Sequence, residues 1–353
     1  MTFSIALMLL GFLGCCESSR PVRFGVIGTG CIGLEHLRNL CLCDSASIAA
    51  IADNHKASRQ AAVSCLQDNG IDVGGVAVYE DYTQLLDSAN VDAVIVCTPN
   101  DHHIEVIRQA FDTGKHLLIE KPLCIDVASC AEAEVLAAHA RAKAQAAGHA
   151  EPLFWCGMEY RYIPAISRLI QEAEGGLIGE PRMLTIREHR FPFLRKVDDW
   201  NRFNSRTGGT LVEKCCHFFD LMRLILKAEP LRVLASGGQD VNHLKETYDG
   251  HQSDILDNAY VIVDFEGGKR ALLEICMFAE CSKHQEEISL VGTHGKLEAF
   301  APSHGVKTDD PNEVNFIRAI RNPAFVHEWD YSEPPPPEEC GTIQQAHEAV
   351  CLI

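Results

Sequence analysis

Near the middle of the chain, three polar residues have the types and spacing of an acid–base site. The stretch Glu213-x-x-x-His217-x-x-Asp220 would place a histidine and two carboxylates on one helix face, at i, i+4 and i+7. His217 could take a proton from a substrate, and Glu213 could steady the imidazolium that forms. Because the neighbouring positions are mainly apolar, two other interpretations stay open: a core histidine, or a metal site made by Glu and His at i, i+4.

A second candidate is Lys121, which stands between a predicted strand and Pro122. A residue before proline is held extended, and this would fix the direction of the lysine side chain. An ammonium group there could hydrogen-bond a substrate hydroxyl and stabilise the charge that develops on its oxygen. An ordinary surface lysine at the end of a strand is the alternative.

A glycine pattern early in the chain predicts a site for a dinucleotide. An apolar run ends in Gly28-Thr29-Gly30-Cys31-Ile32-Gly33, and apolar residues at helical spacing follow. In a βαβ unit the first glycine makes the turn, the second admits a pyrophosphate, and the third lets helix and strand pack closely. An ordinary strand-to-helix turn is the alternative.

The next predicted strand ends at Asp53, about 20 residues beyond the last glycine of the pattern. A carboxylate at this place can accept hydrogen bonds from the adenine-ribose hydroxyls. It would also repel a 2′-phosphate, so the sequence favours NAD over NADP.

Strands and helices alternate through the first part of the chain, which predicts a doubly wound parallel sheet. Ligands of such sheets bind beyond the carboxyl ends of the strands. Two segments therefore belong to the rim of the cofactor site: Thr98-Pro99-Asn100 and Glu120-Lys121-Pro122. The predicted strands cover residues 22–27, 47–52, 76–79, 91–97 and 115–119.

The pattern changes after a long Ala-rich helix at 127–147, and we predict three segments. These are an apolar amino-terminal segment (1–20), a dinucleotide-binding domain (21–148) and an α+β domain with a largely antiparallel open sheet (149–353). A helix at 211–226 would carry the His217 motif, and a short helix is expected at 312–320.

Composition excludes several classes of function. The chain has 353 residues, enough for about two domains, and its net charge of −18 disfavours nucleic-acid binding. Its 16 cysteines contain no CxxC spacing, so we expect reduced thiols and no metal framework. Residues 3–14 are apolar over the length of a signal peptide but too short to span a bilayer, and no Lys or Arg precedes them. A cytoplasmic protein is therefore expected, with secretion as the alternative.

Taken together, the motifs make the chain resemble the Gfo/Idh/MocA oxidoreductases, the glucose-fructose oxidoreductase and inositol dehydrogenase family, from about Val22 onward. The resemblance rests on four motifs in order: Gly28-x-Gly30-x-x-Gly33, Thr98-Pro99-Asn100-x-x-His103, Glu120-Lys121-Pro122, and Gly208-Gly209 leading to His217-x-x-Asp220. It implies a Rossmann domain, NAD as cofactor, and self-association into a homo-oligomer.

The resemblance also implies the roles of individual residues. Lys121 and His217 match the usual catalytic pair of the family, while Glu213 stands where many members carry Asp. The aromatic-Arg pair of the family is matched by Tyr160-Arg161, near the expected substrate. Further hydroxyl-binding candidates, besides Asp220, are Trp200 and Asn201.

The sequence thus predicts an NAD-dependent dehydrogenase that oxidises a secondary alcohol of a cyclic polyol or sugar, with inositol as the first guess. Two alternatives stay open: a dinucleotide-binding sensor without turnover, and an NAD-assisted glycoside hydrolase. Reduction of NAD by a polyol would distinguish the dehydrogenase from the sensor.

Overall fold

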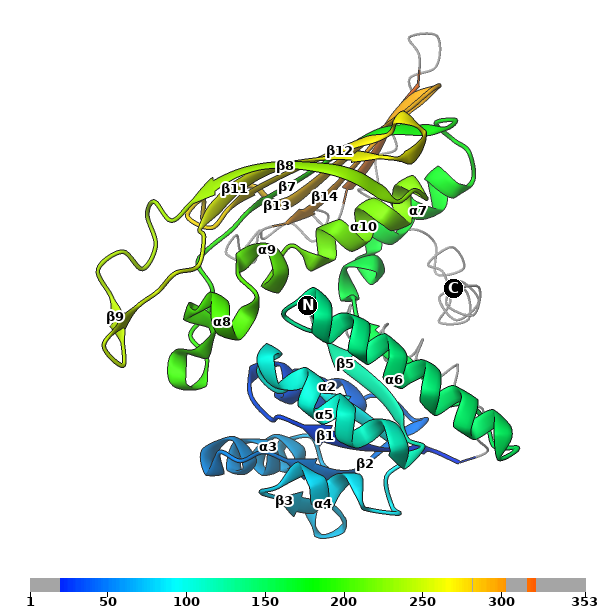
Figure 1. Cartoon of the computed structure of the whole chain (residues 1–353), viewed down its shortest axis with the longest axis vertical. Coiled ribbons are helices and arrows are strands. Elements are labelled where there is room, and N and C mark those ends of the chain that lie inside the picture. Colours follow the sequence, from blue (N-terminus) through cyan, green and yellow to red (C-terminus); the bar gives the residue numbers. More distant parts are fainter. Residues whose placement is uncertain (1–19, 281, 303–315, 322–353) are drawn as a thin grey trace. The chain divides into compact units, whose positions relative to one another are not determined.

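The computed structural model describes residues 20–280, 282–302 and 316–321 (Figure 1). The described residues form two compact units. The first contains residues 20–159 and 195–213, and the second contains residues 160–194, 214–280, 282–302 and 316–321. The predicted amino-terminal apolar segment lies almost wholly outside the described residues.

The first unit is built on a six-stranded sheet in which all neighbouring strands are parallel. The strand order is β3-β2-β1-β4-β5-β6, the order of a doubly wound dinucleotide-binding fold, so the predicted fold class is confirmed. The strands are β1 (Val22–Ile27), β2 (Ala46–Ala52), β3 (Ala77–Tyr79), β4 (Ala93–Val96), β5 (His116–Glu120) and β6 (Phe154–Gly157).

Helices connect these strands, and two of the helices begin at an aspartate that caps the first turn. Asp81 accepts a hydrogen bond from the Thr83 N–H, and Asp126 accepts one from the Ser129 N–H. β6 follows the predicted domain boundary at 148, yet it pairs with β5 because the long helix α6 is the crossover that delivers it. The helices are α2 (Cys31–Leu40), α3 (Lys56–Asp68), α4 (Tyr82–Leu86), α5 (His103–Ala110) and α6 (Val127–Ala146).

The second unit is built on a seven-stranded sheet in the order β15-β14-β13-β7-β12-β11-β8. Its neighbours are antiparallel except β7 and β12, so the prediction of a largely antiparallel sheet is confirmed. The strands are β7 (Pro181–His189), β8 (Pro230–Gly238), β11 (Asn258–Phe265), β12 (Arg270–Cys276), β13 (His284–Gly292), β14 (Gly295–Pro302) and β15 (Phe316–Arg321). A separate small hairpin joins β9 (Thr247–Tyr248) and β10 (His251–Gln252).

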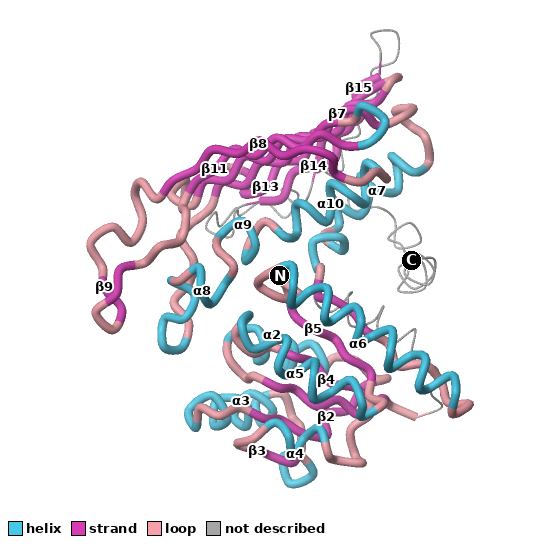
Figure 2. The backbone as a smooth tube through the Cα atoms, viewed as in Figure 1, coloured by secondary structure: helices cyan, strands magenta, loops and turns pink. Residues whose placement is uncertain are grey.

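Helices α7 (Pro164–Glu174) and α10 (Cys216–Leu226) cover one face of this sheet (Figures 1 and 2). No helix of the described residues covers the opposite face in these views. β11 shows the resulting alternation, because Ala259, Val261 and Val263 are buried while Tyr260 and Ile262 are exposed.

The single helix predicted for residues 211–226 is wrong. The structure has α9 (Thr210–Glu213) and α10, separated by a turn at Lys214 and Cys215. Glu213, Lys214 and Cys215 are all buried, and one face of a straight helix does not bury three consecutive side chains. Glu213 and His217 therefore do not share one helix.

The predicted short helix at 312–320 is also wrong where the structure describes it. Residues 316–321 form β15, whose backbone pairs antiparallel with β14 from Phe316 to Arg321. Pairing with an exposed sheet edge satisfies its backbone groups and overrides local helical spacing.

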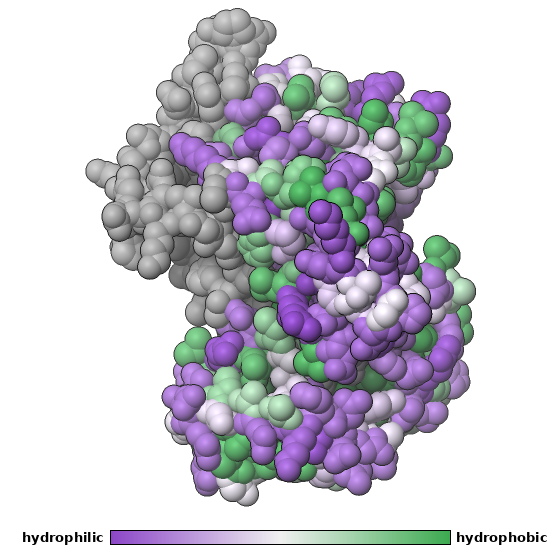
Figure 3. All heavy atoms as spheres, turned by 90° about the vertical axis from the view of Figure 1, so that its left-hand side faces the viewer, coloured by the Kyte–Doolittle hydropathy of each residue, from purple (hydrophilic) through white to green (hydrophobic). Residues whose placement is uncertain are grey.

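Hydrophilic residues dominate the face of the molecule shown in Figure 3, with hydrophobic residues in smaller groups between them. Among the described residues, no helix combines the length and the apolar character that crossing a membrane requires.

Candidate functional site

The three glycines of the turn after β1 differ in how closely other atoms surround them. At Gly28 the φ angle is +85°, and a Cβ would lie 2.6 Å from the Cys97 backbone. At Gly33 a Cβ would lie 2.1 Å from the Gly28 carbonyl oxygen, whereas at Gly30 a Cβ would meet no atom within 4 Å. Packing therefore requires glycine at positions 28 and 33. Gly30 instead leaves open space before the amino end of α2, which begins with Cys31 and Ile32.

Asp53 ties this turn to the end of β2. Its Oδ2 accepts a hydrogen bond from the Thr29 N–H at 2.7 Å, and its Oδ1 accepts one from the His55 N–H at 2.8 Å. Oδ2 also accepts a hydrogen bond from the Thr29 hydroxyl at 3.2 Å, whereas the second lone pair of Oδ1 could still accept one from a ribose hydroxyl. The turn and Asp53 thus fit a dinucleotide with a free 2′-hydroxyl.

The two rim segments are linked by His103, which is fully buried at the start of α5. Its Nδ1 lies 2.9 Å from the Pro122 carbonyl oxygen, and its Nε2 lies 3.1 Å from the Thr98 carbonyl oxygen. Burial lowers the pKa of His103, so the neutral ring, which has one N–H, donates to one of these oxygens. In the first unit His103 therefore holds the Thr98-Pro99-Asn100 turn against the Glu120-Lys121-Pro122 segment.

Glu120 fixes the backbone of Lys121. One oxygen of Glu120 accepts a hydrogen bond from the Lys121 N–H at 3.1 Å, and the other lies 2.7 Å from Nε2 of the buried His36. Burial alone would raise the pKa of Glu120, but His36 and Lys121 outweigh it and hold that pKa below its usual range. The sequence interpretation missed His36, which lies on α2, because its spacing from Glu120 carries no local signal.

The Lys121 ammonium meets Glu213 within the first unit. Lys121 Nζ donates a hydrogen bond to the Glu213 carbonyl oxygen at 2.8 Å and lies 3.8 Å from Glu213 Oε1. Lys196 Nζ lies 3.5 Å from the same Oε1, and the Asn100 side-chain amide donates to Oε2. Burial opposes ionisation of Glu213, but the two lysines and Asn100 hold its pKa below the usual range.

Lys196 was not among the predicted residues, although it precedes a segment that contains predicted ones. Its Nζ lies 4.5 Å from the ring centroid of Trp200, which belongs to the 3-10 turn η5 (Val197–Arg202) with Asn201. Trp200 and Asn201 are both buried, and two consecutive aspartates before them have positive φ angles of 53° and 48°. The closeness of Lys196 and Trp200 in a polar loop of the sequence is the pattern that could have indicated Lys196.

In the second unit, His217 is buried on α10 and stacks on Tyr160 of the 3-10 turn η4 (Glu159–Tyr162). The two ring centroids are 4.3 Å apart and the planes differ by 11°. Arg161 binds Asp220 through two hydrogen bonds of 2.7 and 2.5 Å. Of the second-unit residues predicted from sequence, Tyr160 thus lies against His217, and Arg161 lies against Asp220.

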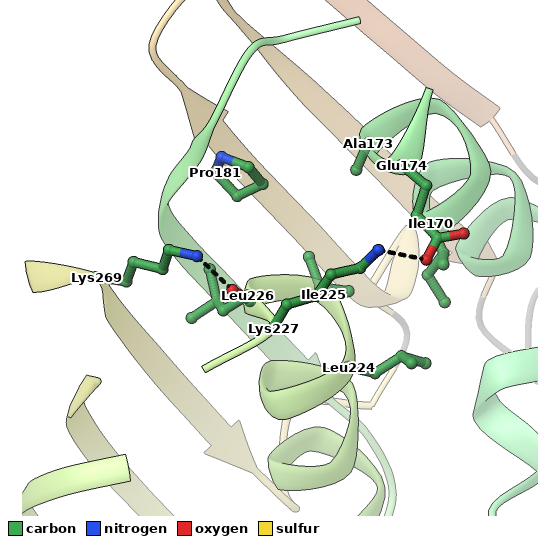
Figure 4. A pocket seen from close by; sticks show the side chains of 9 residues that line it. All are labelled: Ile170, Ala173, Glu174, Pro181, Leu224, Ile225, Leu226, Lys227 and Lys269. Carbon is green, nitrogen blue, oxygen red and sulfur yellow. Dashed lines mark hydrogen bonds and ion pairs between the residues drawn. The ribbon is translucent and has the colours of Figure 1, made fainter. Parts of the chain in front are cut away.

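Among the described residues, no group of three or more His, Cys, Asp and Glu side chains suits a metal ion. A small hollow of the second unit lies beside α7 and the end of α10, where Lys227 pairs with Glu174 at 2.9 Å (Figure 4). None of the residues predicted for the site lines this hollow.

Comparisons with known proteins agree with this architecture. Residues 22–147 match a family model described as an oxidoreductase family with an NAD-binding Rossmann fold. Residues 171–333 match the model of the C-terminal alpha/beta domain of the same family.

Relatives extend the similarity over most of the chain. A myo-inositol 2-dehydrogenase of Thermotoga maritima is 27% identical over 79% of this chain and 75% of its own length. An inositol 2-dehydrogenase of Rhizobium meliloti is 28% identical over the same shares. The crystal structure of myo-inositol dehydrogenase from Lactobacillus casei with NAD(H) and myo-inositol has a TM-score of 0.65 and 20% identity, covering 82% of this chain and 76% of that one. That structure shares the fold. Since models of one family match both parts of the chain, this protein belongs to the Gfo/Idh/MocA family of oxidoreductases.

Proposed function

We propose that this chain is an NAD-dependent dehydrogenase that oxidises a secondary alcohol of a cyclic polyol or sugar. The observation that carries the proposal is the way Lys121 is held at the carboxyl end of β5: Glu120 accepts a hydrogen bond from its backbone N–H, and the Glu213 carbonyl oxygen accepts one from its ammonium group. The carboxyl ends of parallel strands share one edge of a sheet, so Lys121 and the glycine turn after β1 belong to the same edge. The inositol dehydrogenases among the relatives support a cyclic polyol as substrate.

Oxidation of a secondary alcohol removes a proton from the oxygen and a hydride from the carbon, leaving a ketone. NAD, when bound, would supply the acceptor for the hydride. His217 takes the hydroxyl proton, and Lys121 donates a hydrogen bond to the oxygen as negative charge develops. The contacts of Glu213 in the first unit support another task than the predicted one of steadying the imidazolium, namely holding the Lys121 ammonium in place.

For the cofactor, residues 28–33 would hold the pyrophosphate, and Asp53 would accept hydrogen bonds from the adenine-ribose hydroxyls. Replacing Asp53 by Ala should weaken NAD binding while NADP binding changes less, whereas Asp68→Ala, on the exposed end of α3, serves as the control. An unchanged preference for NAD over NADP would remove Asp53 from the ribose site.

The activity is tested by screening for NADH absorbance with myo-inositol, other inositols, aldoses and anhydrosugars. We expect at least one polyol to reduce NAD, and His217→Asn to lower that turnover about 10²–10⁴-fold. The matched control is His149→Asn, at an exposed histidine beyond α6. NAD binding without reduction across the whole screen would contradict the proposal.

We also propose that the chain self-associates through the open face of the second-unit sheet. Tyr260, Ile262 and Met183 are 56%, 44% and 54% exposed on or beside this sheet, although strands usually bury apolar side chains of this size. Tyr260→Glu combined with Ile262→Lys should give a smaller species by light scattering. A wild-type protein that already runs as a monomer would contradict self-association.

A further inference from the structure

Beside His217 lies a cluster of buried polar side chains that the proposed reaction does not use directly. Its charged members are Glu188 on β7, Lys214 in the turn before α10, and Glu286 on β13. Glu188 is 0% exposed and Glu286 is 3% exposed. Burying two carboxylates costs free energy that only close pairing offsets, so their presence beside a functional residue calls for a physical account.

The strand register brings the two carboxylates together. Glu286 and Glu188 are direct partners in the antiparallel pairing of β13 with β7, on the face that the helices cover. Like charges placed directly opposite one another destabilise a sheet. On the other face, the next residue pair is Glu287 with Arg187, which have opposite charges and form an ion pair. The buried pair is therefore the unusual one.

A chain of contacts joins these carboxylates to the histidine. Lys214 Nζ lies 2.9 Å from Glu188 Oε1 and also hydrogen-bonds the Tyr160 hydroxyl. Tyr160 in turn donates its hydroxyl hydrogen to Glu286 Oε1 at 3.0 Å, and the face of its ring stacks on His217. A change in the hydrogen bonds of the Tyr160 hydroxyl can therefore shift the Tyr160 ring, and with it the imidazole ring that stacks on it.

Glu286 can change its charge near neutral pH. Burial and the neighbouring Glu188 raise its pKa to about 7, although Lys214 and the hydrogen bonds from Gln285 and Tyr160 act in the opposite direction. The titratable and charged groups that face Glu286 or its partners come from four places. They are Glu188 on β7 and Arg190 just after it, Lys214 and Cys215 in the turn before α10, His217 on α10, and Tyr160 on η4. On β14, the partner of Glu286 is Ala301, which is apolar.

We propose that Tyr160 and Glu286 are positioning residues for His217, and that ionisation of Glu286 favours the protonated imidazole. An ionised carboxylate accepts the Tyr160 hydrogen bond more strongly than a protonated one does. It also places a negative charge two contacts away from the imidazole, which stabilises imidazolium. The catalytic consequence of this coupling rests on the proposed function, but the coupling itself does not.

The coupling is measured by NMR titration of the full chain with labelled histidine, without substrate. The His217 signal is assigned by its loss in His217→Asn. Glu286→Gln removes the charge and keeps the shape, and we expect it to lower the pKa of His217 by about half a unit to one unit. Tyr160→Phe keeps the stacked ring but removes the hydroxyl, and we expect a smaller shift in the same direction.

The matched control is Glu287→Gln, which removes a carboxylate one residue away on the opposite face and should leave the His217 titration unchanged. A His217 pKa that moves in neither Glu286→Gln nor Tyr160→Phe overturns the proposal, as does an equal shift in Glu287→Gln. If Glu286→Gln fails to fold, Tyr160→Phe decides alone. Failure of the proposed dehydrogenase would look different, because it would appear as NAD binding without reduction by any compound of the screen, and the His217 titration does not depend on that result.

Discussion

In the first unit one buried carboxylate, Glu213, lies beside two lysines. In the second unit two buried carboxylates face each other, and Lys214 and Arg190 both contact Glu188, whereas Glu286 is hydrogen-bonded by the neutral side chains of Tyr160 and Gln285. The pKa of Glu213 is accordingly held below its usual range, while that of Glu286 is raised to about 7. Both residues are deeply buried, so burial alone does not explain the difference. The sign of the nearest charges decides which carboxylate stays ionised.

The contrast suggests different tasks for the two clusters. The first keeps a fixed negative charge beside Lys121, which suits a group that must hold an ammonium in one place through a reaction. The second contains a carboxylate whose proton exchanges near neutral pH, which suits a group that responds to its surroundings. Substituting one lysine of each cluster tests this contrast most directly.

The largest effect is expected from Lys121→Met in the first unit. Turnover should fall about 10²–10⁴-fold, because the group that stabilises the substrate oxygen is lost while the cradle for NAD is intact. NADH production and NAD binding are measured together, with Lys143→Met on the exposed face of α6 as the control. Turnover within a few-fold of the wild type would remove Lys121 from the reaction.

In the second unit, Lys214→Met should act mainly on stability. It removes the cation nearest to the buried Glu188, leaving Arg190 at 3.6 Å, and the loss of one partner from a buried ion cluster costs about 3–5 kcal/mol of unfolding free energy. Thermal and denaturant unfolding measure the loss. We expect Lys121→Met to lose less unfolding free energy than Lys214→Met. Equal unfolding free energies for the two variants would contradict the proposed difference between the clusters.

The features that the sequence predicts correctly are those that depend on residues close together in the chain. The parallel sheet, the glycine turn and the rim segments were predicted because strand ends and glycine spacing are local patterns. The break between α9 and α10 was missed, since the burial of Glu213, Lys214 and Cys215 depends on packing that no helical periodicity records.

The contacts of the site depend on tertiary structure even more strongly. Lys121 could be singled out from its place before proline, but its partners Glu213 and Lys196 lie far along the chain. Glu188 and Glu286 meet through strand register, and a shift of one residue would turn Glu286 to the other face. Sequence spacing therefore singles out candidate residues for the chemistry but not the buried groups that contact them.

The pH dependence of stability should run in opposite directions for the two carboxylates. The raised pKa of Glu286 means that the folded protein keeps a proton which the unfolded chain releases above about pH 4.5. Its contribution to stability is therefore lost as pH rises from about 4.5 to about 7, by at most about 3 kcal/mol. For Glu213, whose pKa is lowered, the contribution is full at neutral pH and is lost as pH falls through its folded-state pKa.

Thermal unfolding of Glu286→Gln and Glu213→Gln across pH separates the two cases. Relative to the wild type, Glu286→Gln should gain stability as pH rises toward about 8, while Glu213→Gln should be weaker at neutral pH and approach the wild type in acid. Parallel curves for the two variants would show that the nearest charges do not control these carboxylates.

The smallest effect is expected from Lys196→Met, which removes one of the two cations beside Glu213. Lys121 still contacts the carboxylate, and methionine can still pack on Trp200, so we expect only a few-fold loss of turnover. Because Lys196 lowers the pKa of Glu213, the acid limb of the turnover profile should move to higher pH in the variant. Lys196→Arg, which restores the charge, should return that limb toward its wild-type position. If the acid limb of the pH–turnover profile is the same in Lys196→Met as in the wild type, Lys121 and Asn100 are sufficient to keep Glu213 ionised. Lys196 would then have no part in setting the charge of the first-unit cluster, although its ammonium lies beside Glu213.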